Sequence, residues 1–247
     1  MPGLIPRRLI LCLGVLCPAG MPLTGMHGPV SAARPGFVRA PGFPQAGPAA
    51  ARGALVWVHG TYGREASGPP DPPDFVGREA ASGLDIWCFN RGRDADPLAG
   101  GAEGLAEGVR GLRAAGYRRV IAAGHSRGAW IALMLLAHPG LAHPGLADAI
   151  VAFSPAAHGT RPERKAQAME EWERVWTAAR GETRVVLVQL ADDPWDPDPA
   201  ARLRIARQHW GTRLLAVFHP EAPTGHGGVY EPAFDEQFGA RIAAFTR

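Results

Sequence analysis

The feature that most constrains the fold is an apolar run at residues 120–123 that leads into Gly-His-Ser-Arg-Gly at residues 124–128 and then into a second apolar run at residues 129–136. The first run suits a buried strand, and the second is long enough only for a helix. The two glycines leave room for a sharp turn, because a side chain two positions before or after Ser126 would crowd it. The pattern predicts a strand, a tight turn and a helix, with the Ser126 hydroxyl exposed at the carboxyl end of the strand.

The helix that follows the turn would direct backbone N–H groups and the positive end of its dipole toward Ser126. Such a point favours a developing oxyanion, which suits a nucleophilic serine. A bare Gly-x-Ser-x-Gly is a weak signal in a chain with 32 glycines, so its surroundings decide the interpretation. The strand, turn and helix around residues 124–128 resemble the nucleophile elbow of the α/β-hydrolase superfamily.

Composition and charge restrict the class of protein. The chain has 247 residues, 46% of them hydrophobic, and this length suits one α/β domain. The formal net charge is +3, but the basic residues are scattered arginines with Lys165 as the sole lysine, and they form no stripe that would favour nucleic acid. The sequence contains no Cys-x-x-Cys, His-Glu-x-x-His or P-loop motif. We therefore expect no metal, no cofactor and no nucleic-acid partner, and the oligomeric state is left open.

The first residues have the pattern of an export signal. Arg7 and Arg8 precede an apolar run at residues 9–17, which a proline and small residues follow. The run is too short to span a bilayer, so no membrane span is expected. We interpret residues 1–19 as an export signal and expect the protein to be periplasmic or secreted.

This leader leaves alternatives open. Cleavage after Ala19 fits the pattern, and so does cleavage near Ala32 or Ala33. Cys17 allows a lipoprotein interpretation, although the bulky Leu16 before it argues against that processing. A twin-arginine signal is the other alternative, but the arginine pair lacks its usual flanking residues.

After the leader, residues 20–52 are rich in proline, glycine and alanine and lack periodicity, which predicts a linker or a surface arm. The folded domain is expected over residues 53–247. Within it, six apolar runs without polar alternation predict strands that are covered on both faces, as in a parallel sheet. These runs lie at residues 55–59, 84–89, 120–123, 149–153, 184–190 and 214–218.

Apolar residues at helical spacing lie between these runs and predict helices on both faces of a mostly parallel, doubly wound sheet. The resemblance implies an α/β-hydrolase fold over residues 53–247, although the usual first antiparallel strands of that family are not evident. Residues 139–183 hold one loop, one strand and one helix, so we expect no large cap domain.

Two later loops carry polar groups where α/β hydrolases have their acid and base. In that family the chain order is serine, acid, histidine. The strand at residues 184–190 leads into a loop with three aspartates, and the last strand leads, after a short loop, to His226. Catalytic groups in such sheets collect outside the carboxyl ends of the strands. The resemblance implies that His226 accepts the Ser126 proton and returns it to the leaving group, while a carboxylate fixes the tautomer of the histidine.

The preferred acid among Asp192, Asp193 and Asp196 is Asp193. In the family the acid commonly stands three positions before the next segment, and Asp193 fits that place. Asp192 is expected to face the neighbouring strand or solvent. Asp196 is expected to brace the turn through its own backbone, because it precedes Pro197 in a loop. Asp196 stays open as the alternative acid.

The oxyanion hole is predicted from a second resemblance. The strand at residues 55–59 ends in His59-Gly60-Thr61, similar to the His-Gly pair that opens the oxyanion loop in the family. The resemblance implies that the N–H of Thr61 pairs with the N–H of Arg127, the residue after the nucleophile. His59 itself is expected to pack beneath the loop.

Together these residues predict a serine hydrolase that cleaves carboxylic esters or related acyl compounds through an acyl-Ser126 intermediate. Its expected partner is a small-molecule acyl substrate. Two alternatives remain: a peptidase or amidase, and a non-catalytic binding protein on a hydrolase fold. A missing or mispositioned acid would favour the binding protein.

Overall fold

The structure is a computed structural model that describes residues 36–62, 70–91, 97–138, 146–218 and 222–247. The expected export signal at residues 1–19, and the part of the expected linker before residue 36, lie outside the described residues. No helix in the described part is long and apolar enough to cross a membrane.

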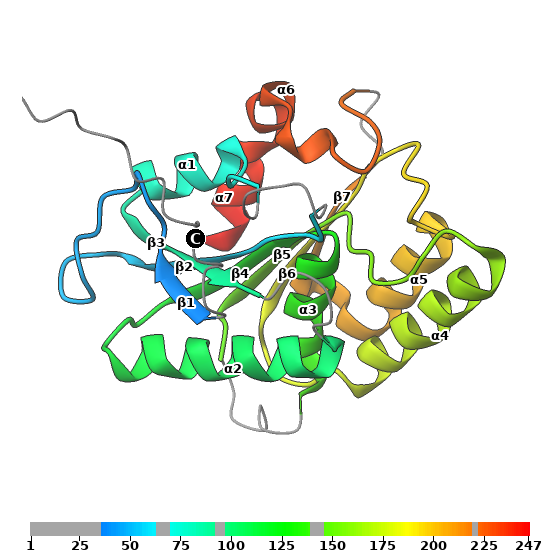
Figure 1. Ribbon diagram of the computed structural model, residues 1–247, viewed down its shortest axis with the longest axis horizontal. Helices are drawn as coiled ribbons and strands as arrows, with labels where there is room; N and C mark the ends of the chain where they lie inside the picture. The colour runs from blue at the N-terminus through cyan, green and yellow to red at the C-terminus, as the bar shows by residue number, and fades with distance from the viewer. Residues whose placement is uncertain (1–35, 63–69, 92–96, 139–145, 219–221) are drawn as a thin grey trace, which may run out of the picture. The chain divides into compact units, whose positions relative to one another are not determined.

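The centre of the domain is a seven-stranded sheet with the strand order β1-β3-β2-β4-β5-β6-β7 (Figure 1). The six apolar runs form the parallel strands, as expected. These are β2 (Gly53–Val58), β3 (Leu84–Asn90), β4 (Val120–His125), β5 (Ala149–Phe153), β6 (Arg184–Gln189) and β7 (Leu214–Phe218). The additional strand, β1 (Gly36–Arg39), runs antiparallel to β3 at the edge of the sheet.

Helices cover both faces of the sheet (Figure 1). One face packs against α2 (Leu98–Ala114), α3 (Arg127–Met134), α4 (Pro162–Ala178) and α5 (Pro199–Trp210). The other packs against α1 (Asp74–Ala81), α6 (Pro232–Phe234) and α7 (Ala240–Thr246), with the π-helical turn η5 (Asp235–Gly239) joining the last two. Both faces are apolar because the central strands β2, β4, β5 and β6 are buried almost throughout.

The folded domain begins before residue 53, because β1 and the arm after it pack on β3. Asp85 of β3 is buried, and its carboxylate accepts the N–H of Ala46 at 2.7 Å and that of Gly47 at 2.8 Å. These bonds satisfy a buried charge and tie the arm to the sheet. The expected boundary between a linker at residues 20–52 and the domain is therefore wrong, and residues 36–52 belong to the domain.

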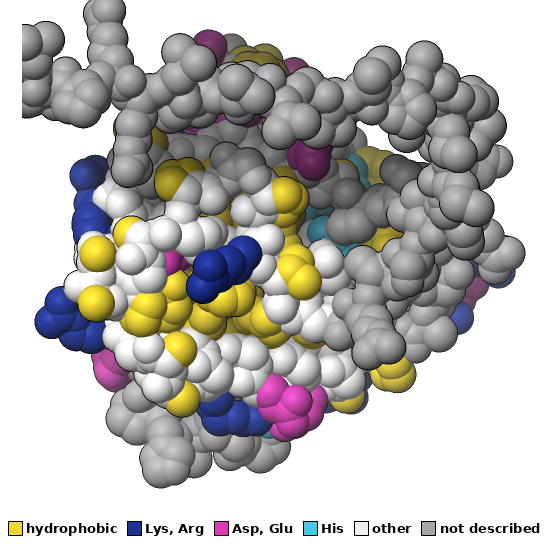
Figure 2. All heavy atoms as spheres, turned by 60° about the vertical axis from the view of Figure 1, so that its left-hand side comes forward, with side chains coloured by type: hydrophobic (Ala, Val, Ile, Leu, Met, Phe, Trp, Pro, Cys, Tyr) yellow, Lys and Arg dark blue, Asp and Glu magenta, His cyan; other side chains and the backbone are white. Residues whose placement is uncertain are grey.

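The edge strand β1 exposes one large apolar side chain, Val38, which is 39% accessible. Figure 2 turns this side of the molecule forward and shows hydrophobic side chains across the described part of the face, with basic side chains among and around them.

The described chain between α3 and β6 contains no separate cap domain. It forms the short 3-10 turn η1 (Leu135–Ala137), the central strand β5 and the helix α4 with their loops. Two further 3-10 turns, η3 (Gly211–Arg213) and η4 (Gly228–Tyr230), flank β7 and the loop after it.

Candidate active site

The turn between β4 and α3 has the sharp backbone that the glycine spacing predicts. Ser126 has a φ of 54° and a ψ of −122°, which non-glycine residues rarely adopt. A Cβ on Gly128 would lie 2.0 Å from the carbonyl oxygen of Val58, and a Cβ on Gly124 would lie 2.8 Å from the same atom. Both glycines are therefore required for the turn to lie this close to β2.

Main-chain hydrogen bonds hold Ser126 in this strained backbone. Its N–H donates to the carbonyl of Phe153 at 3.0 Å. Its carbonyl accepts the N–H of Trp130 at 3.0 Å and that of Ala156 at 3.1 Å. These bonds use only main-chain atoms of Ser126, so its hydroxyl can bond the His226 side chain that it faces.

The structure brings Ser126, His226 and Asp193 into one chain of contacts. The Nε2 of His226 lies 2.8 Å from the Oγ of Ser126. The Nδ1 of His226 lies 3.0 and 2.9 Å from the two carboxylate oxygens of Asp193. Because a carboxylate only accepts, Nδ1 carries the proton and Nε2 is free to accept the serine hydroxyl. Asp193 is buried, with 2% of its side chain exposed, whereas that of His226 is 21% exposed.

The other two aspartates of this loop are turned elsewhere. Asp192 is exposed and has a φ of 57°. Asp196 was expected to brace the turn through its own backbone, and its main-chain N–H does donate to the carbonyl of Asp193 at 3.2 Å. Its carboxylate has a role that was not expected: it forms an ion pair with Arg202 at 3.0 Å and accepts the side-chain amide of Gln189 at 3.0 Å. The Asp193 side chain also braces the turn, because its Oδ1 accepts the main-chain N–H of Trp195 at 2.9 Å.

The pair of Asp196 and Arg202 is almost completely buried, with 6% and 1% of the side chains exposed. The guanidinium carbon of Arg202 lies 3.9 Å from the centre of the Trp172 ring, and one guanidinium nitrogen donates to the carbonyl of Pro155 at 2.8 Å. Burial lowers the pKa of Arg202, and the Asp196 carboxylate opposes that shift. The loop that carries Asp193 is thereby tied to the core by a buried charge pair.

The expected oxyanion residues lie beside the elbow. Thr61 and Arg127 line the same cavity as Ser126, and Arg127 is the first residue of α3, where a backbone N–H has no acceptor within the helix. Gly60 allows the loop to approach, since a Cβ there would lie 3.1 Å from the Cβ of Ser126. His59 is buried beneath the loop, and its Nε2 accepts the N–H of Arg91 at 3.2 Å, which is a structural role.

One residue with a bearing on the site, His125, was missed in the sequence. Its Nε2 donates to the main-chain carbonyl of His226 at 2.7 Å, so it joins the elbow directly to the histidine loop. Its ring lies 4.8 Å from that of His226 and 5.1 Å from that of Tyr230, centre to centre. Burial lowers the pKa of His125 to about 4, so the ring is uncharged near neutral pH. No local pattern indicates this contact, because it joins residues 101 positions apart.

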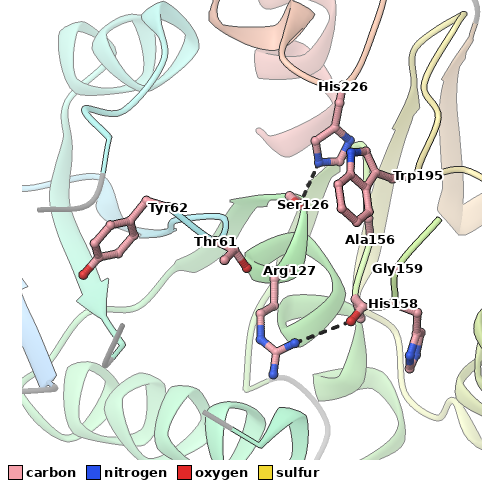
Figure 3. Close-up of a pocket in the computed structure, with 10 residues that line it drawn as sticks. Thr61, Tyr62, Ser126, Arg127, Ala156, His158, Gly159, Trp195 and His226 are labelled. Atoms are coloured by element: carbon pink, nitrogen blue, oxygen red, sulfur yellow. Dashed lines mark hydrogen bonds between the residues drawn. The ribbon is translucent and has the colours of Figure 1, made fainter. Parts of the chain in front are cut away.

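A cavity of about 410 Å³ opens over Ser126. Figure 3 shows the Ser126 and His226 side chains facing each other, with Thr61 and Tyr62 to one side and Trp195 to the other. Below Trp195 in Figure 3 lie Ala156, Gly159 and His158. The full lining consists of Thr61, Tyr62, Ser126, Arg127, Ala156, Ala157, His158, Gly159, Trp195 and His226. This volume suits a small molecule.

Comparisons with known proteins rest on structure. No protein-family profile and no curated protein sequence matches the chain. A bacterial brefeldin A esterase is 17% identical over 85% of this chain and 71% of its own, with a TM-score of 0.58. Esterase 2 of Thermogutta terrifontis, phosphoramylated by tabun, is 18% identical over 84% and 86%, with a TM-score of 0.56. Dipeptidyl peptidase 4 of Porphyromonas gingivalis is 15% identical over 85% of this chain and 32% of its own, with a TM-score of 0.57.

These matches and the mostly parallel seven-stranded sheet with its helices lead to the same fold. The chain has the α/β-hydrolase fold. In this fold, ligands bind outside the carboxyl ends of the parallel strands. Here the loops after β4, β6 and β7 carry Ser126, Asp193 and His226 to that edge, and the loop after β2 adds Thr61. Among the described residues, no three or more His, Cys, Asp or Glu side chains are grouped to hold a metal ion.

Proposed function

We propose that this protein is an exported serine hydrolase that cleaves carboxylic esters or related acyl compounds through an acyl-Ser126 intermediate. The observation that carries the proposal is the unbroken series of contacts from Ser126 Oγ to His226 Nε2 at 2.8 Å and from His226 Nδ1 to the buried Asp193 carboxylate at 2.9 Å. The α/β-hydrolase fold of brefeldin A esterase and of esterase 2 is consistent with it.

In the first half of the reaction, Ser126 Oγ attacks the carbonyl carbon of the ester and its proton passes to His226 Nε2. The carbonyl oxygen becomes an oxyanion that the backbone N–H groups of Thr61 and Arg127 stabilise. Collapse of this intermediate breaks the bond to the alkoxy oxygen, which takes the proton from His226 and leaves as an alcohol. Asp193 holds the imidazole in the required tautomer and stabilises the imidazolium.

In the second half, water attacks the acyl carbon and gives a proton to His226. The acyl–oxygen bond to Ser126 then breaks, Ser126 Oγ recovers the proton, and the carboxylic acid leaves. Every proton in this cycle passes through His226 Nε2, so the 2.8 Å contact to Ser126 is the distance on which the proposal depends.

The experiment that tests this function is a panel of soluble esters, with matched amides of the same acyl groups, assayed on the purified protein and on Ser126→Ala. Ester turnover by the native protein, lost in the variant, supports the proposal. Faster turnover of the amides would favour the peptidase or amidase alternative, and a dipeptidyl peptidase does share this fold. Reversible binding of the esters without turnover would favour a non-catalytic binding protein.

Export is a separate part of the proposal, supported by the leader pattern at residues 1–19. The natively produced protein should be found outside the cytoplasm, and its intact mass should correspond to a chain without the first residues. A full-length species confined to the cytoplasm would refute this part and leave the chemistry untouched.

A further inference from the structure

Trp195 is an unusually placed aromatic side chain. Among the described residues it and Val38 are the large apolar side chains classed as exposed, with 42% of Trp195 accessible. Unlike Val38, Trp195 lines the cavity over Ser126. A large indole left exposed inside a small-molecule cavity offers a flat apolar surface that a ligand can cover.

The backbone of the loop that carries this indole is held beside the reacting groups. The main-chain N–H of Trp195 donates to Asp193 Oδ1 at 2.9 Å, and the next residue, Asp196, is anchored by its buried ion pair with Arg202. The indole centre lies 5.8 Å from the ring centre of His226 at an interplanar angle of 41°. The loop backbone therefore needs no ordering when a ligand contacts the indole, which lowers the entropic cost of binding.

The position of Trp195 indicates which part of an ester substrate it would contact. In ester cleavage the carbonyl oxygen must lie near the N–H groups of Thr61 and Arg127, and the leaving oxygen must lie near His226 Nε2, which protonates it. Figure 3 shows Trp195 beside His226, on the opposite side of the site from Tyr62. The alcohol portion of the ester is the portion that extends past His226.

From this geometry we infer that Trp195 is a specificity-determining residue that binds the alcohol portion of the substrate and selects esters of aromatic or other flat apolar alcohols. The inference rests on the proposed function and narrows its substrate class. The small residues Ala156, Ala157 and Gly159 line the same cavity and leave space in it for such a ring. The contact stabilises the acylation step alone, because the alcohol has left before water attacks.

The test compares two acetate esters, 2-naphthyl acetate and 2,2,2-trifluoroethyl acetate, which form the same acetyl-Ser126. The native protein, Trp195→Ala, Trp195→Phe and the control Val38→Ala are assayed for kcat/KM on both esters and for the single-turnover rate of deacylation. Val38→Ala removes an exposed apolar side chain of similar accessibility away from the cavity. Thermal melting verifies that each variant is folded.

In Trp195→Ala the ratio of kcat/KM for the naphthyl ester to that for the trifluoroethyl ester should fall roughly 5- to 10-fold, the size of one lost aromatic contact. Deacylation should stay at the native rate, Trp195→Phe should restore most of the ratio, and Val38→Ala should leave it unchanged. An unchanged ratio in Trp195→Ala would overturn the inference. So would an equal loss on both esters with slowed deacylation, because that would mean Trp195 only supports His226. A native protein that hydrolyses no ester would instead refute the proposed function.

Discussion

Replacing each aspartate of the loop after β6 by asparagine should separate catalysis from stability. Asp193 bonds His226, Asp196 pairs with buried Arg202, and Asp192 is exposed. We expect Asp193→Asn to lose activity with little loss of stability. Asp196→Asn should lose stability, and while it is folded it should keep activity within about tenfold of the native rate, because Asp193 stays in place.

The magnitudes follow from the contacts. An amide at position 193 cannot hold His226 in the reactive tautomer, and in the best-studied serine triad this costs on the order of 10⁴ in kcat. At position 196 an amide leaves Arg202, 1% exposed, without its opposite charge. Breaking a buried pair in this way costs about 3–5 kcal/mol. For a domain of this size that corresponds to a fall in Tm of roughly 6–20 °C.

The assays are kcat/KM on a soluble ester at a temperature where all variants are folded, and thermal melting followed by circular dichroism. Asp192→Asn is the matched control and should change neither quantity appreciably. The reasoning fails if Asp196→Asn has the same Tm as the native protein. It also fails if Asp196→Asn loses activity by a factor on the order of 10⁴ while Asp193→Asn keeps near-native activity. The second result would mean that the catalytic acid is Asp196, three positions after Asp193.

Two further predictions concern pH and substrate size. In the folded state the pKa of His125 is lowered from 6.5 to about 4. Between these two pH values His125 binds a proton in the unfolded chain but not in the folded chain. The free energy of unfolding should therefore fall as the pH drops from 6.5 toward 4. His125→Gln retains a donor but cannot titrate, so urea titrations at pH 7 and pH 4.5 should show a smaller difference for it than for the native protein; an equal difference would contradict the assigned pKa. Because the cavity is about 410 Å³ and the described residues contain no cap domain, short soluble esters should be preferred over emulsified triglycerides, and a sharp rate increase above the solubility limit of the substrate would count against this.

Local pattern was sufficient for much of the fold. The six parallel strands are mainly apolar runs, and burial of the central strands β2, β4, β5 and β6 on both faces is the physical reason they can be recognised without a partner strand. The tight turn could be predicted because its glycines are sterically required: a Cβ on Gly128 would lie 2.0 Å from the carbonyl oxygen of Val58.

Features that depend on long-range contacts could not be predicted. β1 is four residues long in a proline- and glycine-rich segment, and the arm after it is held by hydrogen bonds from Ala46 and Gly47 to Asp85, 39 and 38 positions away. The same reason applies to His125, whose acceptor is the carbonyl of His226. Asp196 and its partner Arg202 are close in sequence, but no local pattern shows that the carboxylate turns toward the next helix. In each case a polar group is satisfied by a residue that local sequence does not identify.

The measurement that tests the central claim most directly is covalent labelling with a fluorophosphonate probe, followed by peptide mass spectrometry. The account predicts that the probe modifies Ser126 in the native protein, because His226 Nε2 lies 2.8 Å from its hydroxyl, and that esterase activity is lost in proportion to labelling. Ser126→Ala should take up no label. Labelling at the native level in Ser126→Ala, or full labelling of Ser126 with no loss of activity, would contradict the account.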